Sequence, residues 1–249
     1  MFFHNLFIKF IHNIIMGDLS LKDRYKPVAE GAPISEALSS VRGLGQENRH
    51  GEFSAQEARG IYIRGYGVTS ADDKNPVLGT NGMGPCLAVA IYNPTTKKGT
   101  LAHFDTNTDT SSLKKMVDAV RGQGGVLEVH LAGGELGSPH SHQLVEGVVD
   151  RLKSESDVVI RSADIMNTKG GLKALALDTR TGEISNSFMG TQLDPGDRQN
   201  IMGYHASRAL SKESLRPEYL NGVAFSVEDW KLEEQRKNSA PPPAMTYER

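Results

Sequence analysis

The single cysteine of the chain, Cys86, is the side chain best suited to covalent chemistry. A free cysteine usually behaves as a small buried hydrophobe, which is the alternative interpretation. It acts as a nucleophile when a neighbouring group takes its proton, because a thiol with a pKa of about 8.5 is mostly un-ionised at neutral pH. His103 is the candidate partner, and a histidine satisfied at the end of a strand is its structural alternative. The two residues together predict nucleophilic thiol chemistry.

A β-hairpin is predicted to bring these two side chains together. Alternating apolar residues indicate one strand over 87–91, and a second strand over 100–104 returns after a turn. If residues 93–96 form a β-turn, Cys86 stands directly opposite His103, and such pairs have Cβ atoms about 4.5–5.5 Å apart. A wider loop would shift the register by up to about three residues. In the direct pairing, a neighbouring imidazolium would lower the pKa of the thiol.

The imidazole of His103 needs a partner that orients it, and two residues are candidates. Asp105 lies two residues further along the same strand face. Thr80 precedes Cys86 by six residues, and its hydroxyl could reach the other ring nitrogen. The alternative roles are a capping or turn residue for Asp105 and an ordinary loop hydroxyl for Thr80. The sequence leaves both candidates open.

A glycine-rich segment, residues 79–84, precedes the cysteine. A phosphate-binding loop would open a helix, whereas a strand pattern follows here, so we do not expect a nucleotide site. The glycines would instead let the backbone bend closely around the start of the strand. The backbone N–H groups around Gly84 and Cys86 could then form an oxyanion hole, to which Pro85 contributes no donor.

His140, His142 and Glu135 are the candidate metal ligands. Histidines two apart in a loop are more often solvated, and no third or fourth ligand follows at the spacing of a metal site. A single cysteine also excludes an intramolecular disulfide and a zinc site built on cysteine pairs. We therefore expect no metal and no cofactor. The sequence has no G-x-S-x-G segment, which excludes the usual serine-hydrolase elbow.

The composition bounds the architecture and the partners. A chain of 249 residues is expected to hold one globular domain, predicted over residues 56–230. A partly ordered extension is predicted at 1–55 and a flexible tail at 231–249. The 28 Lys and Arg against 30 Asp and Glu give a net charge of −2, which argues against a nucleic-acid surface.

Residues 1–16 form an apolar segment that is too short to span a bilayer. We interpret it as an amphipathic end or as residues upstream of a native start at Met16. A peripheral membrane anchor is the alternative. No targeting signal is recognised, so a cytoplasmic location is expected.

The elements that must position the candidate residues follow a mixed order. Apolar spacing predicts a helix over 113–120, behind the candidate caps Thr110 and Ser111, and another around 145–152, after Pro139 and Ser141. A short helix is predicted after Ser35. A hairpin with Gly182 in its turn closes the pattern. This order predicts an α/β fold with a substantial antiparallel share. Strands are predicted over 61–64, 76–80, 87–91, 100–104, 126–131 and 157–160.

The spacing of Thr80, Cys86 and His103 is similar to that of the Thr, Cys and His of the chemotaxis-receptor glutamine deamidases. Those enzymes also place an Ala-Gly-Gly at a strand end after the first helix, which residues 132–134 resemble. Pro85 is a departure, because the chemotaxis enzymes have Ser beside the nucleophile.

The protein N-terminal asparagine amidohydrolases match longer motifs. Their L-E-V-H-L-x-G-G and H-x-D motifs resemble residues 127–134 and 103–105. The resemblance to the two families covers about residues 76–190. Each motif is short, so the set is more specific than any single member.

Both families imply hydrolysis of a side-chain carboxamide in a protein to a carboxylate and ammonia, through a thioester. The resemblance implies that Cys86 is the nucleophile, that His103 carries the proton and that Thr80 holds the imidazole. It also implies a thiol-deamidase-like fold of two packed, largely antiparallel β-sheets flanked by helices.

The leading hypothesis is therefore a cysteine-dependent protein deamidase. Its partner would be a protein or peptide that bears an N-terminal Asn, or a Gln or Asn within the chain. A non-catalytic protein-binding module on the same scaffold is one alternative, and it predicts ordinary thiol reactivity for Cys86. A thiol protease or transglutaminase is another, and it would release a peptide or join an amine instead of liberating ammonia alone.

Overall fold

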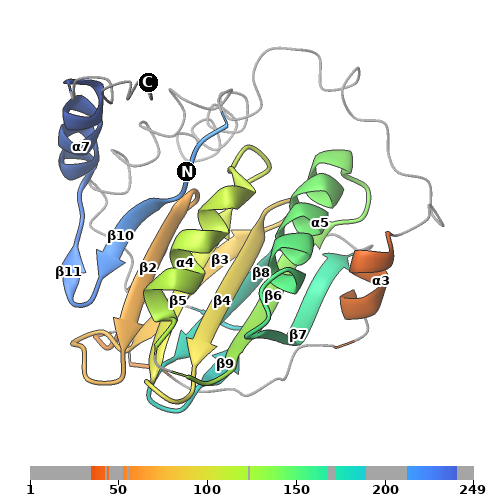
Figure 1. Cartoon of the computed structure of the whole chain (residues 1–249), viewed down its shortest axis with the longest axis horizontal. Coiled ribbons are helices and arrows are strands. Elements are labelled where there is room, and N and C mark those ends of the chain that lie inside the picture. The colour runs from red at the N-terminus through yellow and green to blue at the C-terminus, as the bar shows by residue number, and fades with distance from the viewer. Residues whose placement is uncertain are drawn as a thin grey trace, which may run out of the picture.

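Two β-sheets pack face to face in the computed structural model of the chain, and helices cover the outer face of the larger sheet (Figure 1). Both sheets are mixed, with antiparallel strand pairs in the majority. The predicted fold of two largely antiparallel sheets with flanking helices is confirmed. The structure describes residues 35–42, 44, 53–54, 56–122, 124–167, 172–188 and 212–239.

The larger sheet has seven strands and contains the hairpin that begins after Cys86. Its strands in spatial order are β11 (Val223–Ala224), β10 (Arg216–Leu220), β2 (Gly65–Ser70), β5 (Lys98–Phe104), β4 (Leu87–Asn93), β6 (Leu127–Glu135) and β7 (Val158–Asn167). The smaller sheet has four strands, in the order β1 (Ala58–Gly60), β3 (Val77–Met83), β8 (Lys173–Asp178) and β9 (Glu183–Ser185).

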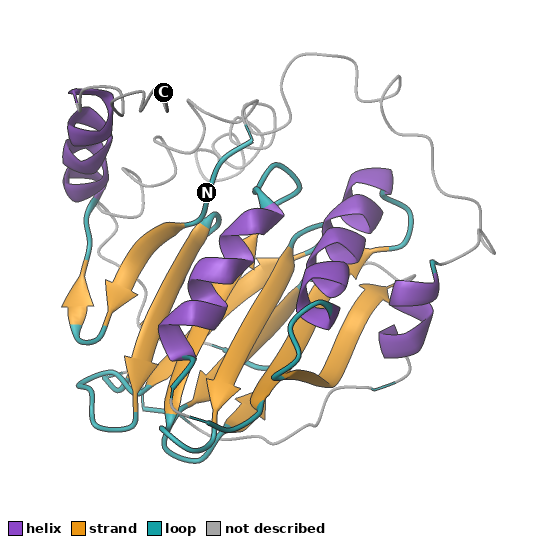
Figure 2. Ribbon diagram, viewed as in Figure 1, coloured by secondary structure: helices purple, strands orange, loops and turns teal. Residues whose placement is uncertain are grey.

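The described helices lie outside the sheets, and Figure 2 shows two of them, α4 and α5, along the same face of the larger sheet. The described helices are α3 (Glu36–Arg42), the 3-10 turn η1 (Thr110–Ser112), α4 (Leu113–Val120), α5 (Pro139–Lys153) and α7 (Val227–Ser239). Helix α4 forms because buried apolar side chains recur at helical spacing, at Leu113, Met116, Val117 and Val120. Helix α5 begins where Ser138 accepts a hydrogen bond from Ser141 N–H and Pro139 supplies a preset φ.

The buried apolar side chains form two main layers. One layer lies between the helices and the larger sheet, and it includes Met116 of α4 and Val148 of α5. The other lies between the two sheets, where small residues of the larger sheet face leucines of β8. Ala88 and Ala132 are among these small residues, and both are 0% exposed. The candidate residues Cys86, His103 and Thr80 belong to the second layer or to its edge.

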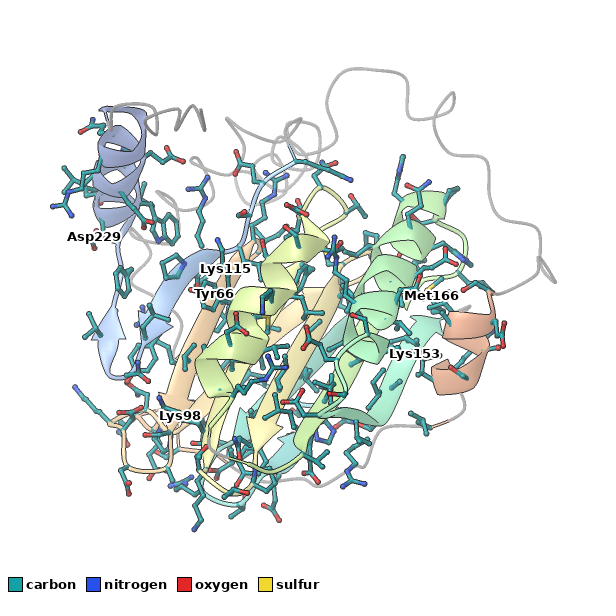
Figure 3. The ribbon with its side chains drawn as sticks, viewed as in Figure 1. Tyr66, Lys98, Lys115, Lys153, Met166 and Asp229 are labelled. Atoms are coloured by element: carbon teal, nitrogen blue, oxygen red, sulfur yellow. The ribbon has the colours of Figure 1, made fainter. Side chains whose placement is uncertain are left out.

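Polar contacts attach the outer helices. Lys153 of α5, labelled in Figure 3, donates a hydrogen bond to the carbonyl oxygen of Ala37 in α3 at 3.2 Å. Trp230 of α7 is 2% exposed, and its Nε1–H donates to the carbonyl oxygen of Pro217 in β10 at 2.6 Å. These bonds join segments that the sequence pattern did not connect.

The structure differs from the sequence prediction at several elements. The strand predicted over 61–64 is wrong: this segment is irregular and links β1 to β2, and Arg64 has a φ of 60°. Strands β2, β10 and β11 and helix α7 were not predicted. Helix α7 continues to Ser239, past residue 230 where the predicted domain ends, and the domain boundaries themselves stay a prediction.

Residues 1–34 and 240–249 are outside the described part of the chain. This applies to residues 1–16, whose interpretation as an amphipathic end or a membrane anchor stays a prediction. Within the described ranges, no helix has the length and apolar character needed to cross a membrane.

Candidate active site

The hairpin of β4 and β5 brings Cys86 and His103 to the same face of the larger sheet. Asn93 pairs with Lys98, so the loop has four residues, and Ala88 stands opposite His103. The predicted direct pairing of Cys86 with His103 is therefore wrong by two residues, and the two side chains are diagonal neighbours. A shift of two residues preserves the face because side chains alternate along a strand. Diagonal neighbours are about 7–8 Å apart, within reach of longer side chains.

The side chain of Asn93 explains the wider loop. Its Oδ1 accepts hydrogen bonds from Thr95 N–H at 3.0 Å and from Thr96 N–H at 3.2 Å. Its Nδ2–H donates to the carbonyl oxygen of Val120 at 2.9 Å, which ties the loop to the end of α4. Lys97 completes the turn with a φ of 52°. These bonds favour a four-residue loop over the two-residue turn that the sequence suggested.

Thr80 determines which nitrogen of His103 carries the proton. Its hydroxyl lies 2.7 Å from the carbonyl oxygen of Ile61 and 2.9 Å from His103 Nδ1. A carbonyl oxygen only accepts, so the single hydroxyl proton of Thr80 points to Ile61. The hydroxyl oxygen must then accept from Nδ1–H, and Nε2 is left as the basic nitrogen. Nε2 is buried and has no hydrogen-bond partner among the described residues.

Burial leaves both candidate reacting groups uncharged. It raises the pKa of the Cys86 thiol to about 12, a rise that the charge of Asp105 increases and that of Arg64 opposes. It lowers the pKa of His103 to about 4, against the opposing effect of Asp105. The expectation that an imidazolium lowers the pKa of the thiol is therefore wrong for the protein without substrate, because His103 is uncharged there. A neutral pair can still react if the thiol proton passes to Nε2 as the sulfur attacks.

Of the two candidate orienting residues, Thr80 holds the bond to the imidazole. The carboxylate of Asp105 is engaged by the turn that follows β5. Its Oδ2 accepts from Arg64 Nε–H at 2.7 Å, and its Oδ1 accepts from Thr108 Oγ1–H at 2.8 Å and Asn107 N–H at 3.0 Å. Asp105 thus has the turn role that was its alternative, and it acts on the thiol through its charge.

Arg64 is a site residue that the sequence did not indicate. Its side chain is 3% exposed, and its charge lowers the pKa of Cys86. Its backbone N–H donates to the carbonyl oxygen of His103 at 2.8 Å, and its left-handed φ turns the chain there. Arg64 alternates with Ile63 like a solvent-facing strand residue, so its sequence position gave no signal.

Two glycines at the end of β6 hold the backbone of the cysteine. Gly134 N–H donates to the carbonyl oxygen of Cys86 at 2.8 Å. Gly133 has a φ of 115°, and a Cβ at this position would lie 2.3 Å from the same oxygen. Only glycine allows this approach. The Ala-Gly-Gly segment at 132–134 therefore has a physical role beside the cysteine.

Ser141, in the first turn of α5, fixes the peptide that precedes Cys86. Its hydroxyl donates to the carbonyl oxygen of Pro85 at 2.9 Å and accepts from Glu135 N–H at 2.8 Å. The residue is 0% exposed, so these bonds are shielded from water. In the sequence, Ser141 only precedes the apolar residues that predict this helix.

The candidate metal ligands lie around the start of α5. The Nε2 atom of His142 is 3.0 Å from the carbonyl oxygen of Leu136, and His140 is in the first turn of the helix. Within the described part of the chain, no group of three or more His, Cys, Asp or Glu is arranged to hold a metal ion.

Comparison with known proteins indicates a family of amide hydrolases. A model described as protein N-terminal asparagine amidohydrolase matches residues 54–171. An uncharacterized protein of Rickettsia conorii is 34% identical over 112 residues, which are 43% of this chain and 67% of that relative. These findings place the chain among the hydrolases that act on the carbon–nitrogen bonds of amides. The chain belongs to the protein N-terminal asparagine amidohydrolase family.

The family match confirms the resemblance drawn from residues 103–105 and 127–134, since both motifs lie inside the matched range. The match also includes Thr80, Cys86 and His103. The suggested kinship with the chemotaxis-receptor deamidases stays a prediction.

Proposed function

We propose that the protein is a cysteine-dependent amidohydrolase that converts the side-chain amide of an N-terminal Asn to a carboxylate and releases ammonia. Membership of the family supports the reaction and the substrate. One observation carries the residue assignment. The bond between Thr80 and His103 leaves Nε2 as an unpartnered base on the sheet face that Cys86 shares, within the described residues.

The first half of the reaction forms a thioester. The sulfur of Cys86 attacks the amide carbon of the substrate while Nε2 of His103 accepts the thiol proton. The imidazolium that forms is stabilised by Thr80, which accepts from Nδ1–H. His103 then gives the Nε2 proton to the amide nitrogen, the carbon–nitrogen bond breaks and ammonia leaves.

The second half restores the cysteine. Water attacks the thioester carbon while Nε2 accepts a proton from it, the carbon–sulfur bond breaks and the proton returns to the sulfur. In both halves, we assign the stabilisation of the negative charge on the carbonyl oxygen to backbone N–H groups near Gly84 and Cys86. Pro85 lies between them and has no N–H group to donate.

The test uses synthetic peptides that begin with Asn, incubated with the protein and with Cys86→Ala. The wild type is expected to release one ammonia per peptide, with a mass gain of about 1 Da as amide becomes acid. The variant is expected to lose activity by roughly 10³-fold or more. Undiminished activity in Cys86→Ala would overturn the proposal.

Matched peptides test the substrate. Acetylation of the α-amino group, replacement of the first Asn by Gln, and an internal Asn are each expected to reduce turnover strongly if the N-terminal Asn is what the site selects. Product analysis also separates the alternatives, since a thiol protease would shorten the peptide and a transglutaminase would add an amine.

Thiol reactivity alone does not separate an enzyme from a binding module here. The raised pKa of Cys86 implies slow alkylation below pH 8 in the resting protein, whichever role it has. The informative measurement is alkylation after a substrate-like peptide is added, because catalysis requires transfer of the thiol proton to His103.

A further inference from the structure

A chain of hydrogen bonds connects His103 to a buried carboxyl group, that of Glu218 in β10. The Oε2 atom of Glu218 accepts from Tyr62 N–H at 2.9 Å. Tyr62 N–H and the carbonyl of Ile61 belong to the same peptide group, and that carbonyl accepts from Thr80 Oγ1–H at 2.7 Å. The Thr80 oxygen in turn accepts from His103 Nδ1–H at 2.9 Å. These hydrogen bonds thus lead from the carboxyl group through a peptide group and the Thr80 hydroxyl to the imidazole of His103.

The fold makes space for this carboxyl group. Glu218 is 2% exposed, and its Oε1 has no hydrogen-bond partner in the described part of the chain. Gly65 of β2 provides the room, because a Cβ at that position would lie 2.1 Å from Oε1. Burying a carboxyl group with an unpartnered oxygen destabilises a protein, so a structural role alone explains its presence poorly.

We propose that Glu218 is a positioning residue for the reaction assigned to Cys86 and His103, acting through the peptide group of Ile61 and Tyr62. This inference rests on the proposed function. An ionised carboxylate strengthens its bond to Tyr62 N–H and so makes the carbonyl oxygen of Ile61 a stronger acceptor. Thr80 then becomes a stronger acceptor for Nδ1–H, and Nε2 becomes a better base for the thiol proton.

The surroundings of Glu218 decide when the carboxylate is ionised. Burial raises its pKa to about 8, against the Tyr62 N–H bond and the positive charge of Arg59 in β1, which both lower it. Arg59 stacks with its guanidinium carbon 5.9 Å from the ring centre of Tyr219, the neighbour of Glu218 in β10. His103, at the far end of the chain of bonds, is uncharged near neutral pH. Glu218 is therefore mainly protonated at pH 7 and mainly ionised at pH 9.

The kinetic test compares Glu218→Gln with the wild type from pH 6.5 to 9.5. Gln has the shape of the neutral acid and retains an acceptor for Tyr62 N–H. The wild-type kcat is expected to equal that of the variant near pH 6.5 and to exceed it by about five-fold at pH 9, with KM unchanged. The matched control is Glu228→Gln in α7, whose side chain is 68% exposed, and it should follow the wild type throughout. A constant ratio between the wild type and Glu218→Gln would overturn the role of Glu218.

A spectroscopic test needs no variant and no turnover. The ¹⁵N and ¹H resonances of His103 Nδ1–H in the wild-type protein are expected to shift between pH 7 and 9, as Glu218 ionises. Resonances that do not move in this range would overturn the inference. This outcome, with Cys86→Ala inactive, would leave the proposed function intact. An active Cys86→Ala would refute the proposed function while the resonances still report on the hydrogen bonds.

Discussion

His103 in β5 and His130 in β6 occupy two similar sites in the larger sheet. Each histidine is 6% exposed, and burial lowers the pKa of each to about 4. Nδ1 of each is bonded to a hydroxyl group, Thr80 at 2.9 Å for His103 and Ser162 at 2.7 Å for His130. Nε2 of each is buried without a partner among the described residues.

The sites differ in what surrounds these common features. His103 lies diagonal to Cys86 across the β4–β5 pair, whereas His130 stands opposite Ala90 in the β4–β6 pair. The tautomer of His103 is also determined, because Thr80 gives its proton to Ile61. The hydroxyl partners are buried alike, since Ser162 beside His130 is 1% exposed and Thr80 beside His103 is 2% exposed. Burial and a lowered pKa thus do not identify a reactive histidine. A reactive histidine is identified by a reacting group close to its unpartnered nitrogen.

The largest difference in kcat is expected between the two variants in which one of these histidines is replaced by asparagine. His103→Asn should lower kcat for ammonia release by roughly 10³-fold, because the general base is lost. His130→Asn should change kcat by less than about three-fold, since no reacting group depends on it. Circular dichroism and thermal unfolding check that both variants fold. Equal losses of kcat in the two folded variants would remove the distinction drawn between these sites.

The next effect concerns stability in acid, where the two histidines should behave alike. Each has a pKa near 4 in the folded protein against 6.5 ordinarily, so its contribution is present above pH 6.5 and lost as the pH falls from there through 4. The loss per histidine at pH 5 should be about 2 kcal/mol in the free energy of unfolding. Urea unfolding at pH 7 and pH 5 measures it. His130→Asn should show a pH dependence smaller by that amount, and an unchanged dependence would contradict the assigned direction.

A smaller effect is expected from removing the two hydroxyl groups. Thr80→Val should lower kcat by roughly ten-fold, because the hydrogen bond that orients His103 is worth about 1.4 kcal/mol. Ser162→Ala, the matched change beside His130, should leave kcat within about two-fold. Thr80→Ser keeps the hydroxyl and should restore most of the rate. A Thr80→Ser variant as slow as Thr80→Val would mean that the methyl group, not the hydrogen bond, matters.

The smallest effect is expected from Ser141→Ala, which loosens the peptide before Cys86. The hydroxyl bridges Pro85 and Glu135, so its loss should lower kcat by about three-fold. The shape of the pH profile should not change, because the His103 contacts remain. A changed profile would show that Ser141 acts on the proton transfer and not on position alone.

Much of this arrangement was predictable from local sequence. The helix at 113–120 and the strands around Cys86 and His103 follow from apolar periodicity, which reports directly on burial. The shared face of Cys86 and His103 survived a register error, because the error was an even number of residues. The register itself depended on hydrogen bonds made by the Asn93 side chain, which periodicity does not reveal.

Other parts of the site had no local signal. Arg64 is buried although its position alternates like a surface residue, because the chain turns there through a left-handed φ. Strand β10 supplies Glu218 from outside the range of the family match. The bond from Tyr62 to Glu218 joins residues 156 positions apart, a separation over which sequence spacing carries no geometric information.

The sequence by itself determined the residue types and the face they share, since periodicity and short turns act over a few positions. Local spacing indicated Cys86 and His103 as a candidate pair, and it left Thr80 and Asp105 both open as the group that orients the imidazole. Only the tertiary structure decided the charge states and the tautomer. Packing two sheets together buries the imidazole and partly buries the cysteine. It also brings Ile61 and Glu218 into the hydrogen bonds that direct the His103 proton.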